Sequence, residues 1–188
     1  MANSCAIRAG FISSDLAIIV RQERLGDHAA VEAVVAAAFA TVGTSDHREH
    51  LLVARLRAAP GFVPQLSLVA TVGDEVVGHV LLTPVVIRGS HGASAALALA
   101  PLSVSPAWQS RGIGARLVMT GHAAACELGH ACAVLLGHPR YYPRFGYARA
   151  DSFGVVLPFD APPEACMVVA LAGQVPPGRV EYPPAFDG

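Results

Sequence analysis

Charged residues are scarce in this chain, and the few that are present nearly balance. Asp, Glu, Lys and Arg make up 14% of the 188 residues, and the formal net charge is −1. Without a basic surplus, the sequence gives no support for nucleic-acid binding as the main task. No apolar run reaches the length of a membrane span, because Gly, Pro or a charged residue interrupts each one. We therefore expect neither a nucleic acid nor a membrane as partner.

Signals for export and for metal binding are also lacking. The first twenty residues contain one arginine and no continuous apolar region followed by a small-residue cleavage site, which predicts a cytoplasmic protein. The four cysteines are scattered and form no C-x-x-C pair. Between Asp46 and His50 the histidines are three apart, without H-E-x-x-H spacing, so a solvated helix start is favoured over a zinc site. No metal is expected.

Hydrophobic residues make up 53% of the chain, enough for a sizeable core. Residues 1–15 carry no periodic pattern and predict a flexible extension, so that 16–188 would form a single domain with an irregular, proline-rich tail from 175 onward. Periodicity and turn signals predict the order β-α-α-β-β-β-α-β-α-β-β. The expected strands cover 16–21, 65–72, 76–88, 97–104, 131–136, 152–159 and 165–171, and the expected helices include 28–40, a segment ending near 58, and one from 115 to about 128.

The most informative stretch runs from Leu97 to Leu117, where a buried strand passes through a glycine-bearing turn into a helix. Such a junction leaves backbone N–H groups unsatisfied at the positive end of the helix dipole, which makes an anion site. Gly112 and Gly114 allow a diphosphate to approach the backbone closely, and Arg111 adds a full positive charge. The expected ligand therefore carries phosphates.

Two common phosphate loops are disfavoured here. A P-loop would continue with Gly-Lys-Ser/Thr, whereas Ala115-Arg116 follow the last glycine, and the third glycine of a dinucleotide fingerprint is replaced by Leu117. The remaining pattern, Gln109-x-x-Gly112-x-Gly114, resembles the acetyl-CoA pyrophosphate loop of the GNAT superfamily of N-acetyltransferases. Taken alone, this pattern is also compatible with an ordinary strand-to-helix turn.

A second motif makes the resemblance more specific. The segment Tyr141 to Tyr147 is similar to the F-Y-x-x-x-G-F segment of the same family, and it follows the next expected strand. Together, residues 137–146 and the tail segment 182–186 further resemble the YhbS-like branch, whose members are mostly described as predicted N-acetyltransferases. The family resemblance, which covers about residues 16–172, implies an α/β GNAT fold. That fold has a mixed, twisted sheet of about six or seven strands, about four flanking helices and parallel strands that splay at the acyl-CoA site.

The resemblance also implies an activity, namely transfer of an acetyl group from acetyl-CoA to a primary amine by direct attack in a ternary complex. The amine would belong to a small molecule or a protein. Main-chain groups of the central strand would pair with the pantetheine arm, as an added strand pairs with a sheet edge. The implied cofactor-binding residues are Leu102, Ser103, Val104, Gln109, Ser110, Arg111, Gly112, Ile113, Gly114, Ala115 and Tyr142.

Tyr142 occupies the general-acid position of the family, and a phenol is a reasonable proton donor to a thiolate because their pKa values are similar. The competing interpretation is a packed aromatic that anchors the segment, which is the role expected of Tyr141. By analogy with the family, main-chain N–H groups of residues 102–104 would stabilise the oxyanion.

The general base is left open by the sequence. Many GNAT enzymes place a carboxylate on or near the central strand, and residues 97–104 contain none. Glu49 is the leading alternative, followed by His79 and His138, and a chain of water molecules could also serve. The missing carboxylate keeps open a non-catalytic acyl-CoA-binding module. A homodimer through the exposed edge of the late hairpin is possible, and the acceptor cannot be identified from sequence.

Overall fold

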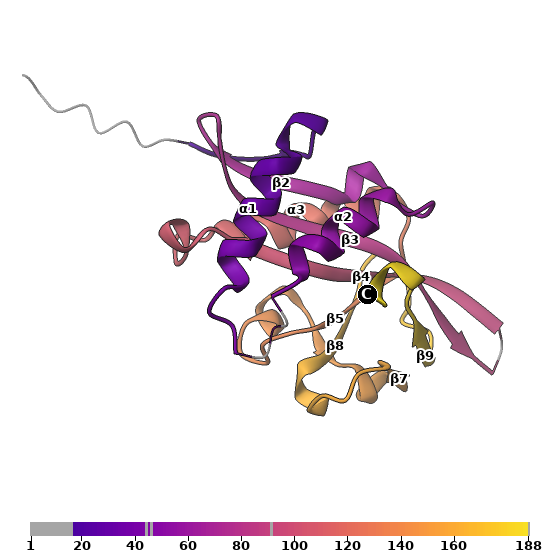
Figure 1. The fold of residues 1–188 in the computed structure, drawn as a ribbon. Helices are drawn as coiled ribbons and strands as arrows, with labels where there is room; N and C mark the ends of the chain where they lie inside the picture. The colour runs from indigo at the N-terminus through magenta and orange to yellow at the C-terminus, as the bar shows by residue number, and fades with distance from the viewer. Residues whose placement is uncertain (1–16, 44, 46, 91, 188) are drawn as a thin grey trace, which may run out of the picture.

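The computed structural model describes residues 17–43, 45, 47–90 and 92–187, so the expected extension at 1–15 lies outside the described part. One mixed sheet of nine strands organises these residues, in the order β1-β2-β3-β4-β5-β8-β6, with β9 paired to β3 and β7 (Figure 1). The strands are β1 (Ile18–Gln22), β2 (Ser67–Val72), β3 (Glu75–Gly89), β4 (Gly92–Val104), β5 (Cys132–Leu136), β6 (Ala148–Arg149), β7 (Val155–Val156), β8 (Cys166–Ala170) and β9 (Gly178–Glu181).

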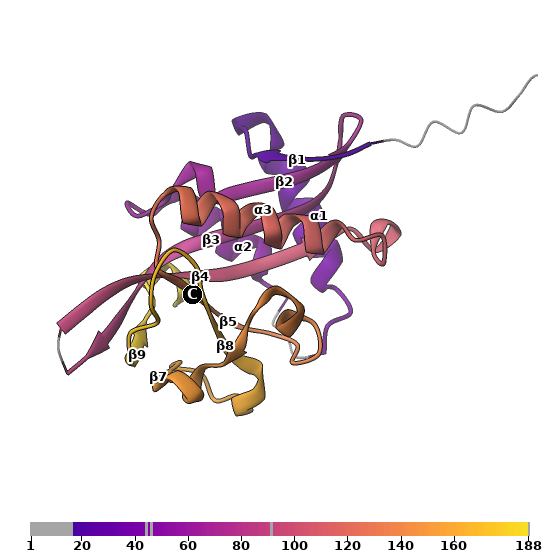
Figure 2. The same cartoon turned by 180° about the vertical axis from the view of Figure 1, so that it is seen from behind.

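Helices cover both faces of the sheet. The helices α1 (His28–Phe39) and α2 (Glu49–Ala58) lie in front of it in Figure 1, and α3 (Ile113–Glu127) lies across the opposite face in Figure 2. The described residues thus contain three α-helices rather than about four. In place of the expected helix after β5 there is a single 3₁₀ turn, Tyr142–Phe145, because Pro143 allows a start and Gly146, at φ 89°, ends it.

Each helix buries one stripe of aliphatic side chains against the sheet. On one face, Val31 and Val35 of α1 and Val53 of α2 are fully buried and pack with β2 and β3. On the other face, Ile113 and Leu117 of α3 join the main core. Spacings of three and four residues place these side chains on one side of each helix. Burying an aliphatic side chain of this size contributes about 1.5–3 kcal/mol.

The C-terminal segment differs from the sequence expectation in two places. The strand predicted at 152–159 is reduced to the two residues of β7, preceded by a 3₁₀ turn. The tail predicted to be irregular contains β9, which pairs with β3 from Val86–Glu181 to Arg88–Arg179. Both predictions were wrong. In the tail, the prolines flank β9 instead of interrupting it, and Val180 of β9 is buried in the core.

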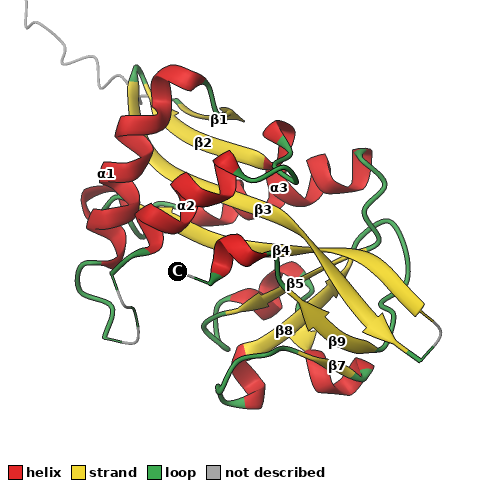
Figure 3. Ribbon diagram, turned by 45° about the vertical axis from the view of Figure 1, so that its right-hand side comes forward, coloured by secondary structure: helices red, strands yellow, loops and turns green. Residues whose placement is uncertain are grey.

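The central strand β4 separates from β5 along the chain, as expected for an open cofactor edge. In the described part of the chain, the two parallel strands pair at Leu97–Ala133 and Ala98–Val134 and at no later residue of β4. On its other side, β4 stays paired with β3 up to Val104, with a bulge at residues 100–101 (Figure 3). The end of β4 therefore offers main-chain groups on one edge. No helix within the described ranges is long and apolar enough to cross a membrane.

Candidate active site

The glycine loop leads directly into the N-terminus of α3. This helix begins at Ile113, two residues earlier than predicted, and Gly112 stands before it in the left-handed conformation with φ 78°. No side chain caps the first turn, so its N–H groups remain available to a ligand. The Arg111 guanidinium lies 4.8 Å from the centre of the Trp108 ring, close to the same loop. A fifteen-residue helix with an uncapped N-terminus is suited to binding an anion.

The end of β4 is tied to this loop by a side chain. Gln109 Nε2 donates a hydrogen bond of 3.1 Å to the main-chain carbonyl of Val104. The Ser103 side chain is buried, and its hydroxyl donates toward the carbonyl of His79 on β3 at 3.5 Å. The Ser103 hydroxyl is therefore turned toward β3 and is not placed as an acyl carrier.

Tyr141 reaches the glycine loop, which the sequence did not predict. A Cβ atom on Gly114 would lie 2.6 Å from the Tyr141 hydroxyl and 3.7 Å from a methyl group of Val104. The Tyr141 ring packs edge-on against Tyr142, with centres 5.1 Å apart, and the Arg144 guanidinium lies 4.9 Å above it. Tyr141 therefore spans from the neighbouring tyrosine to the start of α3, and the absence of a side chain at 114 makes room for its hydroxyl.

Tyr142 is held in a fixed position by its neighbours. A Cβ atom on Gly137 would collide with the Tyr142 ring, so glycine is required there. The centres of the Tyr142 and Tyr147 rings are 5.6 Å apart, and the Tyr147 hydroxyl is 3.1 Å from Nε2 of His122. Burial raises the pKa of Tyr142 well above its usual value, so the phenol stays protonated.

These elements meet at a pocket of about 730 Å³. Its walls come from the end of α1, the start of α2, residues 99–102 of β4, residues 136–138 at the end of β5, the two adjacent tyrosines and the loop 160–165. The pocket brings together Leu102, Tyr142, Glu49 and His138, which are distant in sequence. It also contains Asp160, which sequence reasoning missed because no motif surrounds it.

Glu49 lies at the first residue of α2 and faces this pocket. One of its carboxylate oxygens accepts a hydrogen bond from the Ser45 hydroxyl. The other oxygen is buried and has no hydrogen-bond partner among the described residues. A carboxylate in this state is well suited to accept a hydrogen bond or a proton from a ligand.

His79 is placed elsewhere and does not contribute to the pocket. It is fully buried on β3, where its Nε2 lies 3.1 Å from the Ser67 hydroxyl and 3.8 Å from a carboxylate oxygen of Glu23. Burial lowers the pKa of His79, and the nearby Glu23 opposes this shift. The expectation that His79 could serve as the base was therefore wrong. No group of three or more His, Cys, Asp or Glu side chains in the described ranges is arranged to hold a metal ion.

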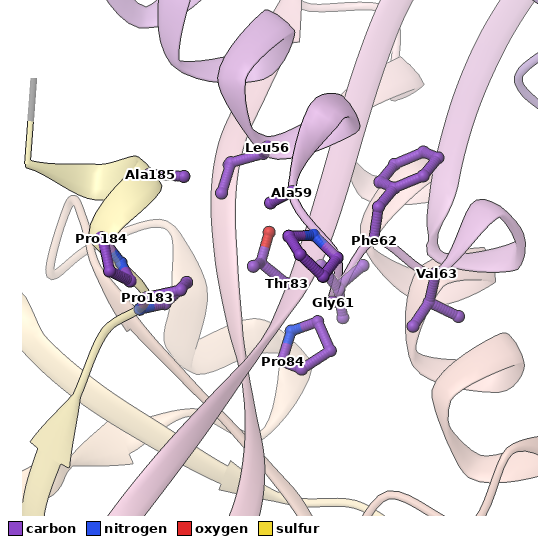
Figure 4. Close-up of a pocket in the computed structure, with 12 residues that line it drawn as sticks. Leu56, Ala59, Gly61, Phe62, Val63, Thr83, Pro84, Pro183, Pro184 and Ala185 are labelled. Atoms are coloured by element: carbon purple, nitrogen blue, oxygen red, sulfur yellow. The ribbon is translucent and has the colours of Figure 1, made fainter.

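A smaller pocket of about 230 Å³ lies between the end of α2, β3 and the tail (Figure 4). Its walls are apolar and include Pro84, Pro183 and Pro184, and the Thr83 hydroxyl points into it. It contains neither a carboxylate nor a basic group, so it lacks the means to bind or deprotonate an amine. Of these two pockets, the larger one therefore has the acidic and basic side chains among its described residues.

Comparisons with known proteins agree with this geometry. A profile described as "Acetyltransferase (GNAT) family" matches residues 29–147. The chain is 37% identical over 131 residues to YjhQ, an uncharacterized N-acetyltransferase of Escherichia coli K12, covering 68% of this chain and 72% of the relative. It is 32% identical over 126 residues to the uncharacterized N-acetyltransferase YhbS of the same strain, covering 65% and 74%.

Two solved structures extend the similarity to nearly the whole fold. A GNAT family acetyltransferase from Brucella melitensis, in complex with acetyl-CoA, has a TM-score of 0.77 and 35% identity over 92% of this chain and 99% of that one. YhbS from E. coli, in complex with CoA, has a TM-score of 0.81 and 30% identity over 92% and 93%. These matches confirm the predicted GNAT fold and the resemblance to YhbS. The chain belongs to the acetyltransferase (GNAT) family.

Proposed function

We propose that this protein transfers the acetyl group of acetyl-CoA to a primary amine of a small molecule or protein, by direct attack of the amine. The observation that carries the proposal is the convergence of Leu102, Tyr142 and Glu49 on one pocket. The β4 edge of this pocket continues into the uncapped start of α3. Acetyltransferase membership supports acyl transfer in general, and the complexes of the two structural neighbours support the choice of acyl donor.

The residues at the open edge fit acetyl-CoA. Where β5 has diverged, the main-chain groups of Leu102, Ser103 and Val104 that are not bonded to β3 would bind the amide-bearing pantetheine arm. Residues Gln109 to Ala115, with Gly112 in a left-handed conformation, would hold the pyrophosphate at the helix N-terminus. When bound, acetyl-CoA supplies an activated thioester carbonyl.

The side chains of the pocket would manage the protons. Glu49 would take one proton from the acceptor ammonium and so produce the neutral amine that attacks. The main-chain N–H groups of residues 102–104 would stabilise the negative charge that develops on the carbonyl oxygen. Tyr142, which remains protonated, would donate to the departing thiolate sulfur. His138 lines the same pocket but is exposed, and it is the second candidate for the base.

A CoA-release assay over a panel of amines tests the proposal. We expect free thiol to appear only when acetyl-CoA and a suitable amine are both present. The chain contains no lysine, because all thirteen of its Lys and Arg residues are arginine, so acetylation of its own lysines cannot contribute to the signal. Amine-independent release would instead indicate hydrolysis.

A non-catalytic acyl-CoA-binding module is the second candidate, because no residue of β4 is a carboxylate. In that case acetyl-CoA would raise the melting temperature, but no amine would increase the release of CoA. A chain that gives neither the thermal shift nor the release would contradict both candidates. The cytoplasmic location and the homodimer stay predictions.

A further inference from the structure

The charges around the pocket restrict the kind of acceptor that it can take. Among the described residues, its walls carry two carboxylates, Glu49 on α2 and Asp160 on the loop after β7, and neither arginine nor lysine. The other titratable side chains facing it are His138 and the two adjacent tyrosines. The nearby Arg55 of α2 points its Nε to the carbonyl of Ala185 in the tail. The pocket therefore favours a cation and disfavours an anion.

The unpartnered carboxylate oxygen of Glu49 also favours a cationic ligand. Glu49 lines the pocket together with Phe39, Val42 and Leu52, and one of its carboxylate oxygens is buried without a hydrogen-bond partner among the described residues. A carboxylate buried among apolar side chains is costly unless a hydrogen-bond donor meets it. An ammonium group would satisfy this oxygen, and Ser45 already satisfies the other.

The remaining walls indicate what the ammonium is attached to. Besides Phe39, Val42 and Leu52, the apolar residues of the walls include Leu136 and Pro162. Apolar walls bind the carbon skeleton of a ligand, and a few placed polar groups set its orientation. The volume of about 730 Å³ accommodates a small acceptor together with the acetylated end of the donor.

We propose that the acceptor is a small primary amine with an apolar body and no carboxylate of its own, such as an arylalkylamine or alkylamine. This inference rests on the proposed function and narrows it, since amino acids and the C-termini of short peptides would bring a negative charge beside Glu49 and Asp160. Rejection of the carboxylate by like charge is what separates the two groups of acceptors.

Matched acceptors that differ by one carboxylate test the inference in the full-length protein. We expect kcat/KM for phenethylamine to exceed that for phenylalanine at least about tenfold, and hexylamine to exceed norleucine similarly, because a like-charge contact in a desolvated pocket costs a factor of this order. Equal values for the two members of each pair would overturn the inference.

Asp160 provides the decisive variant because it is exposed and has no part in the proposed proton transfers. We expect Asp160→Arg to reduce the amine-to-amino-acid ratio to below about threefold by placing a cation at the rim. Asp74→Arg, in the exposed turn between β2 and β3, is the matched control and should leave the ratio unchanged. A ratio that does not respond to Asp160→Arg would also overturn the inference.

Separate outcomes distinguish a wrong function from a wrong acceptor class. If no amine in any panel releases CoA, the proposed function is wrong. The preference of the pocket for amines without a carboxylate can then still be tested by ligand binding. Thermal shifts with CoA present should then be larger for phenethylamine than for phenylalanine in the unmodified protein. Equal shifts, or a larger shift with phenylalanine, would contradict the charge argument itself.

Discussion

The cofactor end and the acceptor end of this site are built from different parts of the chain. At the glycine loop the groups proposed to bind the cofactor are main-chain N–H groups of consecutive residues from Gly112 into α3. At the acceptor pocket they are side chains such as Glu49, Asp160 and Tyr142, which come from three separate segments. The first arrangement imposes a local sequence pattern, whereas the second requires only that the fold bring those segments together.

The largest effect is expected where the two ends meet, at Tyr142. We expect Tyr142→Phe to lower kcat by about 10²–10³-fold, because general-acid catalysis contributes about 10²–10⁴-fold. The KM for acetyl-CoA should stay within about twofold, since the ring and its contacts with Tyr141 and Tyr147 are kept. Steady-state kinetics measure both. Tyr182→Phe, in the aromatic cluster of the tail, is the control, and retained turnover in Tyr142→Phe would remove the acid role.

Glu49 tests the acceptor end alone. We expect Glu49→Gln to lower kcat/KM for the amine by about 10–100-fold at pH 7, while acetyl-CoA binding stays unchanged. Since an alkylamine with a pKa near 10 deprotonates itself as pH rises, the activity of the variant should recover toward pH 9–10. A pH–rate profile compares the two proteins. Equal deficits at all pH values would point away from a base at this residue.

Gly114 tests the cofactor end alone. We expect Gly114→Ala to raise the dissociation constant for acetyl-CoA by about tenfold, because the new methyl group meets the Tyr141 hydroxyl at 2.6 Å and narrows the approach to α3. Calorimetric titration measures this change. Gly26→Ala is the control, since a methyl group there meets nothing within 4 Å. An unchanged affinity would show that this end tolerates a side chain.

The cofactor end was largely readable from sequence for a physical reason. Glycine in a left-handed conformation and a helix start are local requirements, so Gly112 and the following apolar periodicity predicted the start of α3 to within two residues. The splay of β4 from β5 followed from the family resemblance. The strand β9 was missed because its four residues are stabilised by pairing with β3, more than ninety residues earlier, and not by any local propensity.

The acceptor end was only partly readable. Glu49 was selected because it lies on the second helix, and the structure places it in the pocket. His79 was selected as a titratable residue on a strand, but strand position alone does not say which face a side chain occupies once a bulge shifts the register. Asp160 had no signal at all, since it is a lone acid in a proline-containing loop.

Glu23 lies outside the cofactor end and the acceptor end of the site, and we expect its replacement to affect stability more than activity. Burial would raise its pKa, but the nearby His79 and the hydrogen bonds from Ser67 and Arg57 lower it from 4.5 to about 2. The charged form therefore stabilises the fold fully above about pH 4.5, and this contribution is lost as pH falls toward 2. We expect Glu23→Gln to cost about 3 kcal/mol at pH 7, because Arg57 loses its buried partner. Chemical denaturation at pH 7 and pH 3 measures the difference, which should shrink at the lower pH.

The smallest effect on activity is expected at His79. A variant at this residue tests whether the active site excludes the buried groups of β3. The ring is fully buried beside Ser67 and Glu23, and it does not line the pocket. We expect His79→Gln to leave kcat/KM within about twofold at every pH where the protein is folded, although its melting temperature should fall. A pH–rate profile whose acidic limb moved in this variant would mean that a proton reaches β3 from the pocket. In that case Glu23 could not be treated as a purely structural carboxylate, distinct from the proposed catalytic Glu49.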